Sequence, residues 1–428
     1  MKPIAIDPIL FVRNRDRLRK LLPENSLALL NANDPMPTNA DGTMGFHQNA
    51  DLFHLTGINQ EETILVLAPD AFDEKQREML FIREPNEHLA IWEGHKLSRE
   101  EATKISGIKS VRWLSDFPSV FHGLMSEVEK VFLNSNEHAR SSSEVATRDG
   151  RFVNWCRSKY PLHEYRRLAR MMHELRAVKS DQEIDLIRRA SEISGKAFRR
   201  VLRFVRPGVN EAEIEAEYAH EFIRNRAQFA YCPIIASGDS SNVLHYIEND
   251  KTCKAGQLLL LDVAAGLGNY MSDLTRTIPV SGRFSRRQRQ VYNAVLRTFR
   301  AVVAEMKPGV LTRDLRKLTE DLIEKECIDL GLLSRSDIRK QSPDRPAVRK
   351  YFMHGVAHPI GLDVHDVGFT TKPVTAGWVL TCEPGIYIRE EKFGIRLENT
   401  ILVTEKGPVD LMPNVPIEAD EIEKLMNR

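Results

Sequence analysis

Two stretches of the chain share one pattern of apolar and acidic positions. In each, a glycine opens a run of mostly apolar residues that ends on an acid six positions later, at Asp262 and at Glu383. Runs of this length predict buried strands. A second acid follows each run, Asp273 in the first stretch and Glu398 in the second. Because a buried carboxylate is costly unless it is paired, hydrogen-bonded or bound to metal, the four acids predict a site for two divalent cations.

A helical pattern also repeats in this half of the chain. A capping box at Ser180–Glu183 opens an amphipathic helix, and Pro207-Gly208-Val209 ends it. The same turn recurs 101 residues later as Pro308-Gly309-Val310, after a helix with a capping box at Ser285–Gln288. With the acid-bearing strands, this predicts two copies of a helix–helix–sheet unit, folded face to face around a cleft. Chance similarity between amphipathic helices is the alternative.

The first half of the chain predicts an α/β domain of its own over residues 1–173, followed by a second domain over 174–428. Its strand-like runs lie at 26–30, 63–68 and 78–82, and its helical segments lie near 11–21, 98–105 and 142–157. The charged segment Glu174–Ser180 is the expected connection. Residues 334–350 are rich in Arg and Lys without periodicity, which predicts a solvated loop; a partner-binding patch is the alternative.

Charge and composition narrow the class of protein. The 61 Lys and Arg residues balance 60 Asp and Glu residues, so electrostatics give no reason to expect nucleic-acid or membrane partners. Asp7 and Pro8 interrupt the apolar stretch that a secretory signal needs, and no run approaches the ~20 residues of a membrane span. The five scattered cysteines form no paired motif and indicate reduced thiols. We therefore expect a cytoplasmic protein.

Three histidines lie between the two pairs of acids, at positions 354, 358 and 365. His354 and His358 have the spacing of a zinc-protease helix, but Gly355 replaces the glutamate of that motif and Pro359 would stop the helix. Each acid alone is more typical of a helix cap or a surface ion pair, and a lone histidine is more typical of a structural residue. As a set they indicate a metal site, in which two divalent ions would neutralise the four carboxylates.

Several segments of the chain resemble one known family: 245–250, 261–264, 272–277, 353–366, 382–387 and 395–399. They are similar to the proline-specific metallopeptidases of the pita-bread fold, which comprise aminopeptidase P and prolidase. In the first half, His47–Gly57 resembles a segment of the aminopeptidase P N-terminal domain. The resemblance covers nearly the whole chain. It implies an α+β fold, in which a C-terminal pita-bread catalytic domain follows an α/β N-terminal domain that serves oligomerisation and closes the substrate end.

The resemblance also implies five metal ligands. Asp262 would bind one ion with both carboxylate oxygens, and Asp273 and Glu398 would bridge the two ions. His358 and Glu383 would complete the shell of the second ion. Mn²⁺ is the ion that the family implies, with Co²⁺, Zn²⁺ and Fe²⁺ open.

Further residues take roles from the same resemblance. His245, His354 and His365 would line the substrate site, and His365 would also stabilise the oxyanion. A hydroxide held between the ions would attack the peptide carbonyl, and Glu383 would carry a proton from the water to the leaving proline nitrogen. Arg396 would orient a ligand carboxylate. Asn399 stands where relatives often have an acid, and we expect it to face away from the metals.

The expected function is that of an Xaa-Pro aminopeptidase that acts on peptides with proline in the second position. A dipeptidase of the prolidase type would share all five ligands and is the nearest alternative. A non-catalytic pita-bread module and a metal-free hydrolase of the creatinase type are less favoured, because both lack the ligands. A homodimer or homotetramer is expected. Trp92 would reach a neighbouring subunit's site or pack within its own chain.

Overall fold

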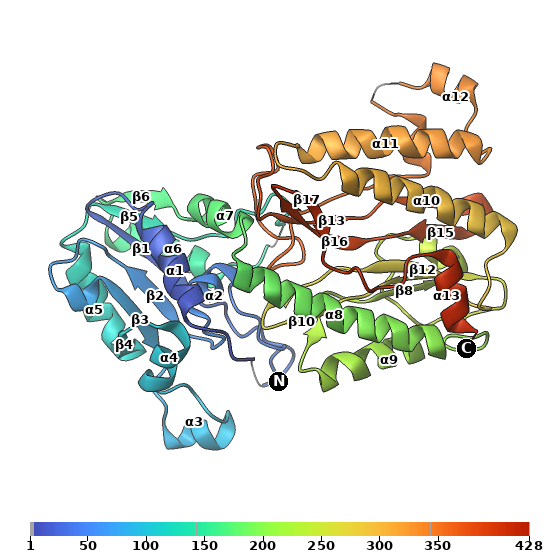
Figure 1. Ribbon diagram of the computed structural model, residues 1–428. Helices are drawn as coiled ribbons and strands as arrows, with labels where there is room; N and C mark the ends of the chain where they lie inside the picture. Colours follow the sequence, from blue (N-terminus) through green and yellow to red (C-terminus); the bar gives the residue numbers. More distant parts are fainter. Residues whose placement is uncertain (1–3, 143, 343, 428) are drawn as a thin grey trace. The chain divides into compact units, whose positions relative to one another are not determined.

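The computed structural model describes residues 4–142, 144–342 and 344–427 (Figure 1). The chain divides into two compact units. The N-terminal unit comprises residues 5–176, and the C-terminal unit comprises residues from 177 onward together with Ile4. Among the described residues, no helix is both long and apolar enough to cross a bilayer.

A six-stranded mixed sheet forms the centre of the N-terminal unit. Its strands run in the order β4 (Ser110–Trp113), β3 (Glu78–Ile82), β2 (Ile64–Leu67), β1 (Ser26–Asn31), β5 (Lys130–Leu133) and β6 (Glu164–Arg167). Side chains of β1 alternate between two cores, since Leu27 and Leu29 join one and Ala28 and Leu30 join the other. Helices therefore cover both faces. The first core packs under α5 (Phe117–Met125) and α6 (Arg148–Lys159), and the second under α1 (Ile9–Arg19), α2 (Ala50–Thr56), α4 (Arg99–Ser106) and α7 (Ala169–Ala177).

The predicted strands of this unit are confirmed as β1, β2 and β3, and its predicted helices as α1, α4 and α6. The expected connection Glu174–Ser180 was wrong in its first half. Residues up to Ala177 form the last turn of α7, because Met172 and Leu175 pack into the core of this unit. Only residues 178–180 then remain between α7 and the next helix.

Two helix pairs and the strands between them make up the C-terminal unit (Figure 1). The pairs are α8 (Asp181–Phe204) with α9 (Glu211–Arg224), and α10 (Arg286–Ala304) with α11 (Thr312–Asp329). One sheet has the order β12 (Thr275–Pro279), β9 (Leu258–Asp262), β8 (Ile234–Ser237), and another has the order β13 (Val379–Cys382), β16 (Asn399–Thr404), β17 (Gly407–Asp410). Two smaller sheets join β7 (Gln228–Phe229), β10 (Ala265–Leu267) and β11 (Tyr270–Met271), and β14 (Gly385–Ile388) with β15 (Phe393–Arg396). Helix α13 (Ala419–Met426) ends the unit.

The predicted duplication is present in the backbone. Gly208 and Gly309 both have φ of 95°. Each also donates its N–H at 2.8 Å to a carbonyl across the turn, Gly208 to Cys253 and Gly309 to Val374. The Ser285 capping box is formed as well. The two helix pairs are thus terminated and connected in the same way.

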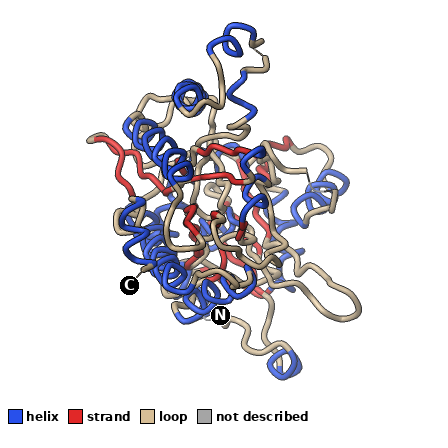
Figure 2. Tube along the Cα trace, turned by 90° about the vertical axis from the view of Figure 1, so that its right-hand side faces the viewer, coloured by secondary structure: helices blue, strands red, loops and turns tan. Residues whose placement is uncertain are grey.

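The turn between β10 and β11 has positive φ at Gly268 and Asn269. Two other local features can be compared with the sequence-based expectations. The basic segment 334–350 was wrongly predicted to be loop throughout, because Ser334 and Asp337 form a capping box that opens α12 (Arg335–Lys340). Trp92 in α3 (Glu87–Trp92) is 75% exposed and contacts the His88 ring of the same helix, so it is not buried in a core of its own chain. Helices α3 and α12 each project from the edge of their own unit in Figures 1 and 2.

Candidate metal centre

The candidate site forms where the two larger sheets of the C-terminal unit meet. Asp262 ends β9 opposite Thr275 of β12, and Thr275 also forms a β-bridge with Glu398. The Glu398 N–H donates to the Thr275 carbonyl at 3.0 Å. Strand β12 thus lies between Asp262, from the first half of the duplicated unit, and Glu398, from the second half.

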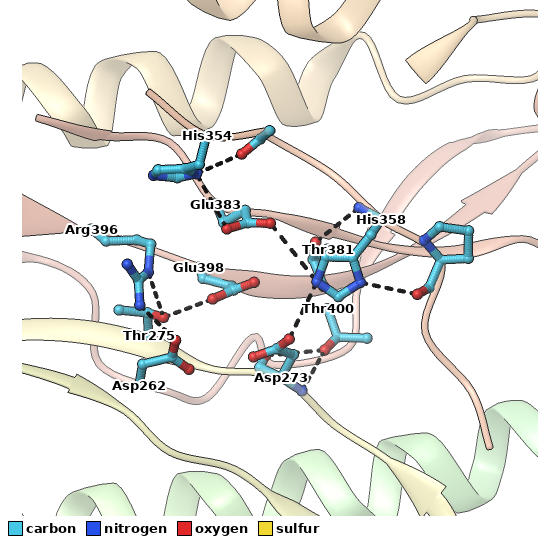
Figure 3. Close-up of polar contacts among 12 residues, drawn as sticks. Asp262, Asp273, Thr275, His354, His358, Thr381, Glu383, Arg396, Glu398 and Thr400 are labelled. Carbon is cyan, nitrogen blue, oxygen red and sulfur yellow. Dashed lines mark hydrogen bonds and ion pairs between the residues drawn. The ribbon is translucent and has the colours of Figure 1, made fainter. Parts of the chain in front are cut away.

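Asp273, His358 and Glu398 come closest to a metal-binding triad. All three are buried, and each offers a ligand atom within 4.8 Å of the other two. His358 Nε2 lies 3.5 Å from Asp273 Oδ2 and 3.8 Å from Glu383 Oε1 (Figure 3). Four of the five predicted ligands therefore lie close together around the His358 imidazole: His358 itself, Asp273, Glu383 and Glu398.

The tautomer of His358 suits a ligand. Its Nδ1 lies 3.0 Å from the Pro359 carbonyl, which accepts the proton of that nitrogen. In the neutral imidazole the lone pair is then on Nε2, the nitrogen that faces the acids; against the effect of burial, Asp273 and Glu383 raise the pKa of His358. The backbone on both sides is fixed, because the His358 N–H donates to Thr381 Oγ1 at 3.2 Å and the His358 carbonyl accepts from the Thr381 N–H at 2.9 Å.

Asp262 adjoins this triad through two other side chains. Its Oδ2 lies 2.5 Å from Arg396 Nη2, and its Oδ1 accepts from the Tyr231 hydroxyl at 2.6 Å. The same hydroxyl lies 2.7 Å from Asp273 Oδ1. Tyr231 thus joins the two acids of the first stretch, while Arg396 opposes the charge of one of them.

Arg396 and Thr275 hold the Glu398 carboxylate in place. Arg396 Nε donates to Thr275 Oγ1 at 3.2 Å, and Thr275 Oγ1 donates to Glu398 Oε2 at 2.7 Å (Figure 3). Arg396 Nη1 donates to the Tyr387 hydroxyl at 2.9 Å. As expected, Asn399 faces away from this cluster, where its side chain bonds Arg276 and Asp410.

Glu383 and His354 line the other side of the cluster. Glu383 Oε2 lies 3.5 Å from His354 Nδ1. His354 Nδ1 also lies 2.6 Å from the Gly355 carbonyl, and His354 Nε2 lies 2.8 Å from the Tyr387 hydroxyl. The segment 352–366 contains no helix, so a zinc-protease helix is excluded here.

The other two predicted histidines are exposed. The His365 ring stands edge-on to that of His358, with ring centroids 4.4 Å apart at 89°. His245 lies in the loop between β8 and β9, and positive charge on its ring would lower the pKa of His354. The structure therefore places His365 beside the metal-binding triad and His245 within electrostatic reach of His354.

Burial and mutual repulsion govern the protonation of the acids. Burial raises the pKa of Glu383 to about 7 and the pKa of Glu398 well above its ordinary value. Burial also raises the pKa of Asp262, against the lowering effect of Arg396. Burial lowers the pKa of His354 to about 3, so this imidazole is neutral. Four converging carboxylates thus oppose one guanidinium, which is a donor set that fits divalent cations.

Sequence reasoning missed several of these side chains. Thr275 lies two residues after Asp273, a spacing that could have placed both on one face of a strand. Tyr387 follows Glu383 by four residues across the turn into β14. Tyr231 carries no such signal, because it lies in an irregular segment before β8.

Comparison with known proteins adds an independent finding. Residues 185–405 match metallopeptidase family M24, and residues 11–132 match the N-terminal domain of aminopeptidase P. The Xaa-Pro aminopeptidase of Escherichia coli is 30% identical, over 97% of each chain. A zinc-substituted structure of E. coli aminopeptidase P in complex with product is 30% identical, covers 99% of each chain and superimposes with a TM-score of 0.88. Aminopeptidase PepP of Pseudomonas aeruginosa gives a TM-score of 0.89 at 30% identity, with 99% of each chain covered.

Proposed function

This chain belongs to the aminopeptidase P branch of metallopeptidase family M24, and we propose that it removes the first residue from peptides that carry proline in the second position. It is a metallo-aminopeptidase of the pita-bread fold. The observation that carries the proposal is the convergence of Asp273, His358 and Glu398 within 4.8 Å, with Asp262 and Glu383 beside them.

Five side chains would hold two divalent ions. Asp262, Asp273 and Glu398 supply carboxylates from the junction of the sheets, and His358 and Glu383 supply the remaining donors. Bound ions of this kind lower the pKa of water to ~7 and polarise a carbonyl. We propose Mn²⁺, because carboxylates outnumber imidazole in the set; Co²⁺, Zn²⁺ and Fe²⁺ suit the same donors.

The chain's own groups would manage the proton. Glu383 is our choice to accept a proton from the attacking water and deliver it to the leaving proline nitrogen. Its carboxylate lies 3.8 Å from His358 Nε2 and 3.5 Å from His354 Nδ1, so it adjoins both the triad and a histidine of the proposed substrate pocket. Arg396 and Thr275 hold Asp262 and Glu398 in place through the hydrogen bonds described above.

Selectivity for proline would rest on the histidines. The bond before proline has no amide hydrogen, so a site that binds this bond must read the shape of the ring instead. His245, His354 and His365 are proposed to line that pocket, with neutral imidazole at His354. His365, beside His358, is also proposed to stabilise the oxyanion.

A dipeptidase restricted to Xaa-Pro is the second candidate, because it would use the same five ligands. Hydrolysis of Ala-Pro, Ala-Pro-Ala and longer peptides separates the two. An aminopeptidase cleaves the longer substrates, whereas a dipeptidase cleaves Ala-Pro alone. The domain boundary at 173/174, the homodimer or homotetramer and the cytoplasmic location stay predictions.

Replacing Asp273 tests the proposed function. Asp273→Ala should abolish both Mn²⁺ binding and hydrolysis of Ala-Pro-Ala, because Asp273 contacts His358 and Tyr231 at the centre of the cluster. Glu405→Ala is the matched control, since Glu405 is an exposed acid in the same unit. Near-normal turnover by Asp273→Ala would refute the assignment.

A further inference from the structure

A buried ion pair lies outside the metal cluster in the same unit. Lys179 Nζ is 3.0 Å from Asp366 Oδ2, and each side chain is only 1% exposed. A pair buried so completely is weak evidence for stability alone, because the desolvation of both charges offsets much of their attraction. Its position in the chain indicates what else it does.

Lys179 is fixed through its backbone as well as its side chain. It directly precedes Ser180, the N-cap of α8, and its N–H donates to the Gly377 carbonyl at 2.9 Å. Gly377 leads into β13, the strand that ends just before Glu383. The backbone of Lys179 is therefore hydrogen-bonded to the residue that leads into β13, and its ammonium group extends from there.

Asp366 closes a short loop, residues 359–366, that begins directly after His358 and contains His365. Its N–H donates to the Pro359 carbonyl at 2.9 Å, which joins the two ends of the loop. His358 directly precedes one end, and His365 directly precedes the other. The second carboxylate oxygen, Oδ1, accepts from the Val367 N–H at 2.9 Å. Lys179 and Val367 thus fix the rotamer of Asp366, and with it the backbone next to His365.

Gly361 leaves the space that the ion pair needs. A Cβ atom at this position would lie 2.2 Å from Asp366 Oδ2 and 2.9 Å from Lys179 Cε. The Gly361 carbonyl accepts from the Met271 N–H at 2.7 Å, two residues before Asp273. The loop is therefore tied to the first half of the duplicated unit at its start and to Lys179 at its end.

We propose that Lys179 and Asp366 are positioning residues that set the place of His365 relative to His358. This inference rests on the proposed function, in which His358 binds metal and His365 lines the substrate site. The T-shaped contact of the two rings depends on the loop keeping its register, and the ion pair is a buried side-chain contact at the end of the loop next to His365. Directional hydrogen bonds to both oxygens of one carboxylate fix its orientation relative to the backbone, and an apolar side chain in the same space would not form these bonds.

The test compares the single variant Lys179→Met with the double variant Lys179→Met/Asp366→Leu. The single variant leaves a buried carboxylate unpaired, and we expect it to lower Tm, to reduce kcat on Ala-Pro-Ala about 10–100-fold and to raise the Kd for Mn²⁺ about tenfold. The double variant replaces the pair by apolar side chains and should regain Tm. It should recover neither kcat nor Kd, because the directional contact is still missing.

Arg15→Met is the matched control, because it removes a buried cation that pairs with Glu78 in the N-terminal unit. It should lower Tm and leave kcat and Kd unchanged. A single variant with wild-type kcat and Kd, or a double variant that regains both together with Tm, would overturn the proposal. If the wild-type chain fails to cleave any Xaa-Pro peptide, the proposed function falls, and calorimetric titration of Mn²⁺ into the same variants still decides whether the pair fixes the loop that places His365 against His358.

Discussion

The Tyr231 hydroxyl has one proton and two carboxylate neighbours, Asp262 at 2.6 Å and Asp273 at 2.7 Å. Burial and the nearby acids raise the pKa of Tyr231 well above its ordinary value, so the group remains a donor. Groups that orient metal ligands in this way typically contribute 10–100-fold to metal affinity. Tyr231→Phe should therefore raise the Kd for Mn²⁺ by about that factor, measured by titration calorimetry, with little change in Tm. Tyr292→Phe, which loses a buried hydroxyl bonded to Ile417, is the control and should bind Mn²⁺ normally.

A second residue, in the N-terminal unit, gives a pH-dependent prediction. Burial raises the pKa of Asp149 to about 7, although Asn31 donates to it at 2.8 Å. Between pH 4 and 7 the unfolded chain releases a proton that the folded chain keeps, so the free energy of unfolding falls as pH rises. Asp149→Asn keeps an acceptor for Asn31 and cannot ionise. It should be more stable than wild type at pH 8, by up to about 4 kcal/mol, and similar at pH 4.

Denaturant titration at the two pH values measures this difference. Asp41→Asn, at an exposed acid of the same unit, serves as the control and should show no such dependence. An equal effect of Asp149→Asn at pH 4 and pH 8 would contradict the prediction, since it would place the change in packing rather than in ionisation.

At the scale of elements, the duplicated turn makes a prediction about backbone strain. Gly208 and Gly309 each have φ of 95°, and a Cβ at either position would meet no atom within 4 Å. Alanine there is strained by the backbone alone, so Gly208→Ala and Gly309→Ala should each lower the free energy of unfolding by about 1–2 kcal/mol. Gly123→Ala in α5, an exposed helical position, should instead stabilise the protein by up to about 1 kcal/mol. Urea denaturation of all three variants checks the expected difference in sign.

Elements with strong periodicity were predictable, and those built by distant packing were not. The helix at Asp181–Phe204 was expected because its cap, apolar stripe and terminating turn agree locally. The end of α7 was missed because a charged sequence is held helical by a core contact of Leu175. The same limit applies to the site. The acids stand at or next to the ends of regular strands, whereas Tyr231 reaches the cluster, and Lys179 reaches Asp366 beside it, from irregular segments that only the folded chain brings near.

At the scale of the whole molecule, the predicted metal ligands and the N-terminal unit belong to different parts of the chain. All five predicted ligands, from Asp262 to Glu398, lie in the C-terminal unit. Ligand binding stabilises only the state that binds, by about 2.7 kcal/mol at a free concentration of 100 times Kd. Because the two units have separate cores, the stabilisation by metal should be confined to the unit that holds the ligands.

Hydrogen exchange on the full chain tests this expectation. Peptides from 177–427 should exchange more slowly with saturating Mn²⁺ than with chelator, most of all β9, β12 and β13, because these strands carry or adjoin the acids. Peptides from 5–142 should exchange at the same rate in both conditions. The Asp273→Ala chain supplies the control, since it should show no response to Mn²⁺ in either unit. Protection that spread equally into the N-terminal sheet would mean that the two units unfold as one cooperative body, and a division into independent units would then be wrong.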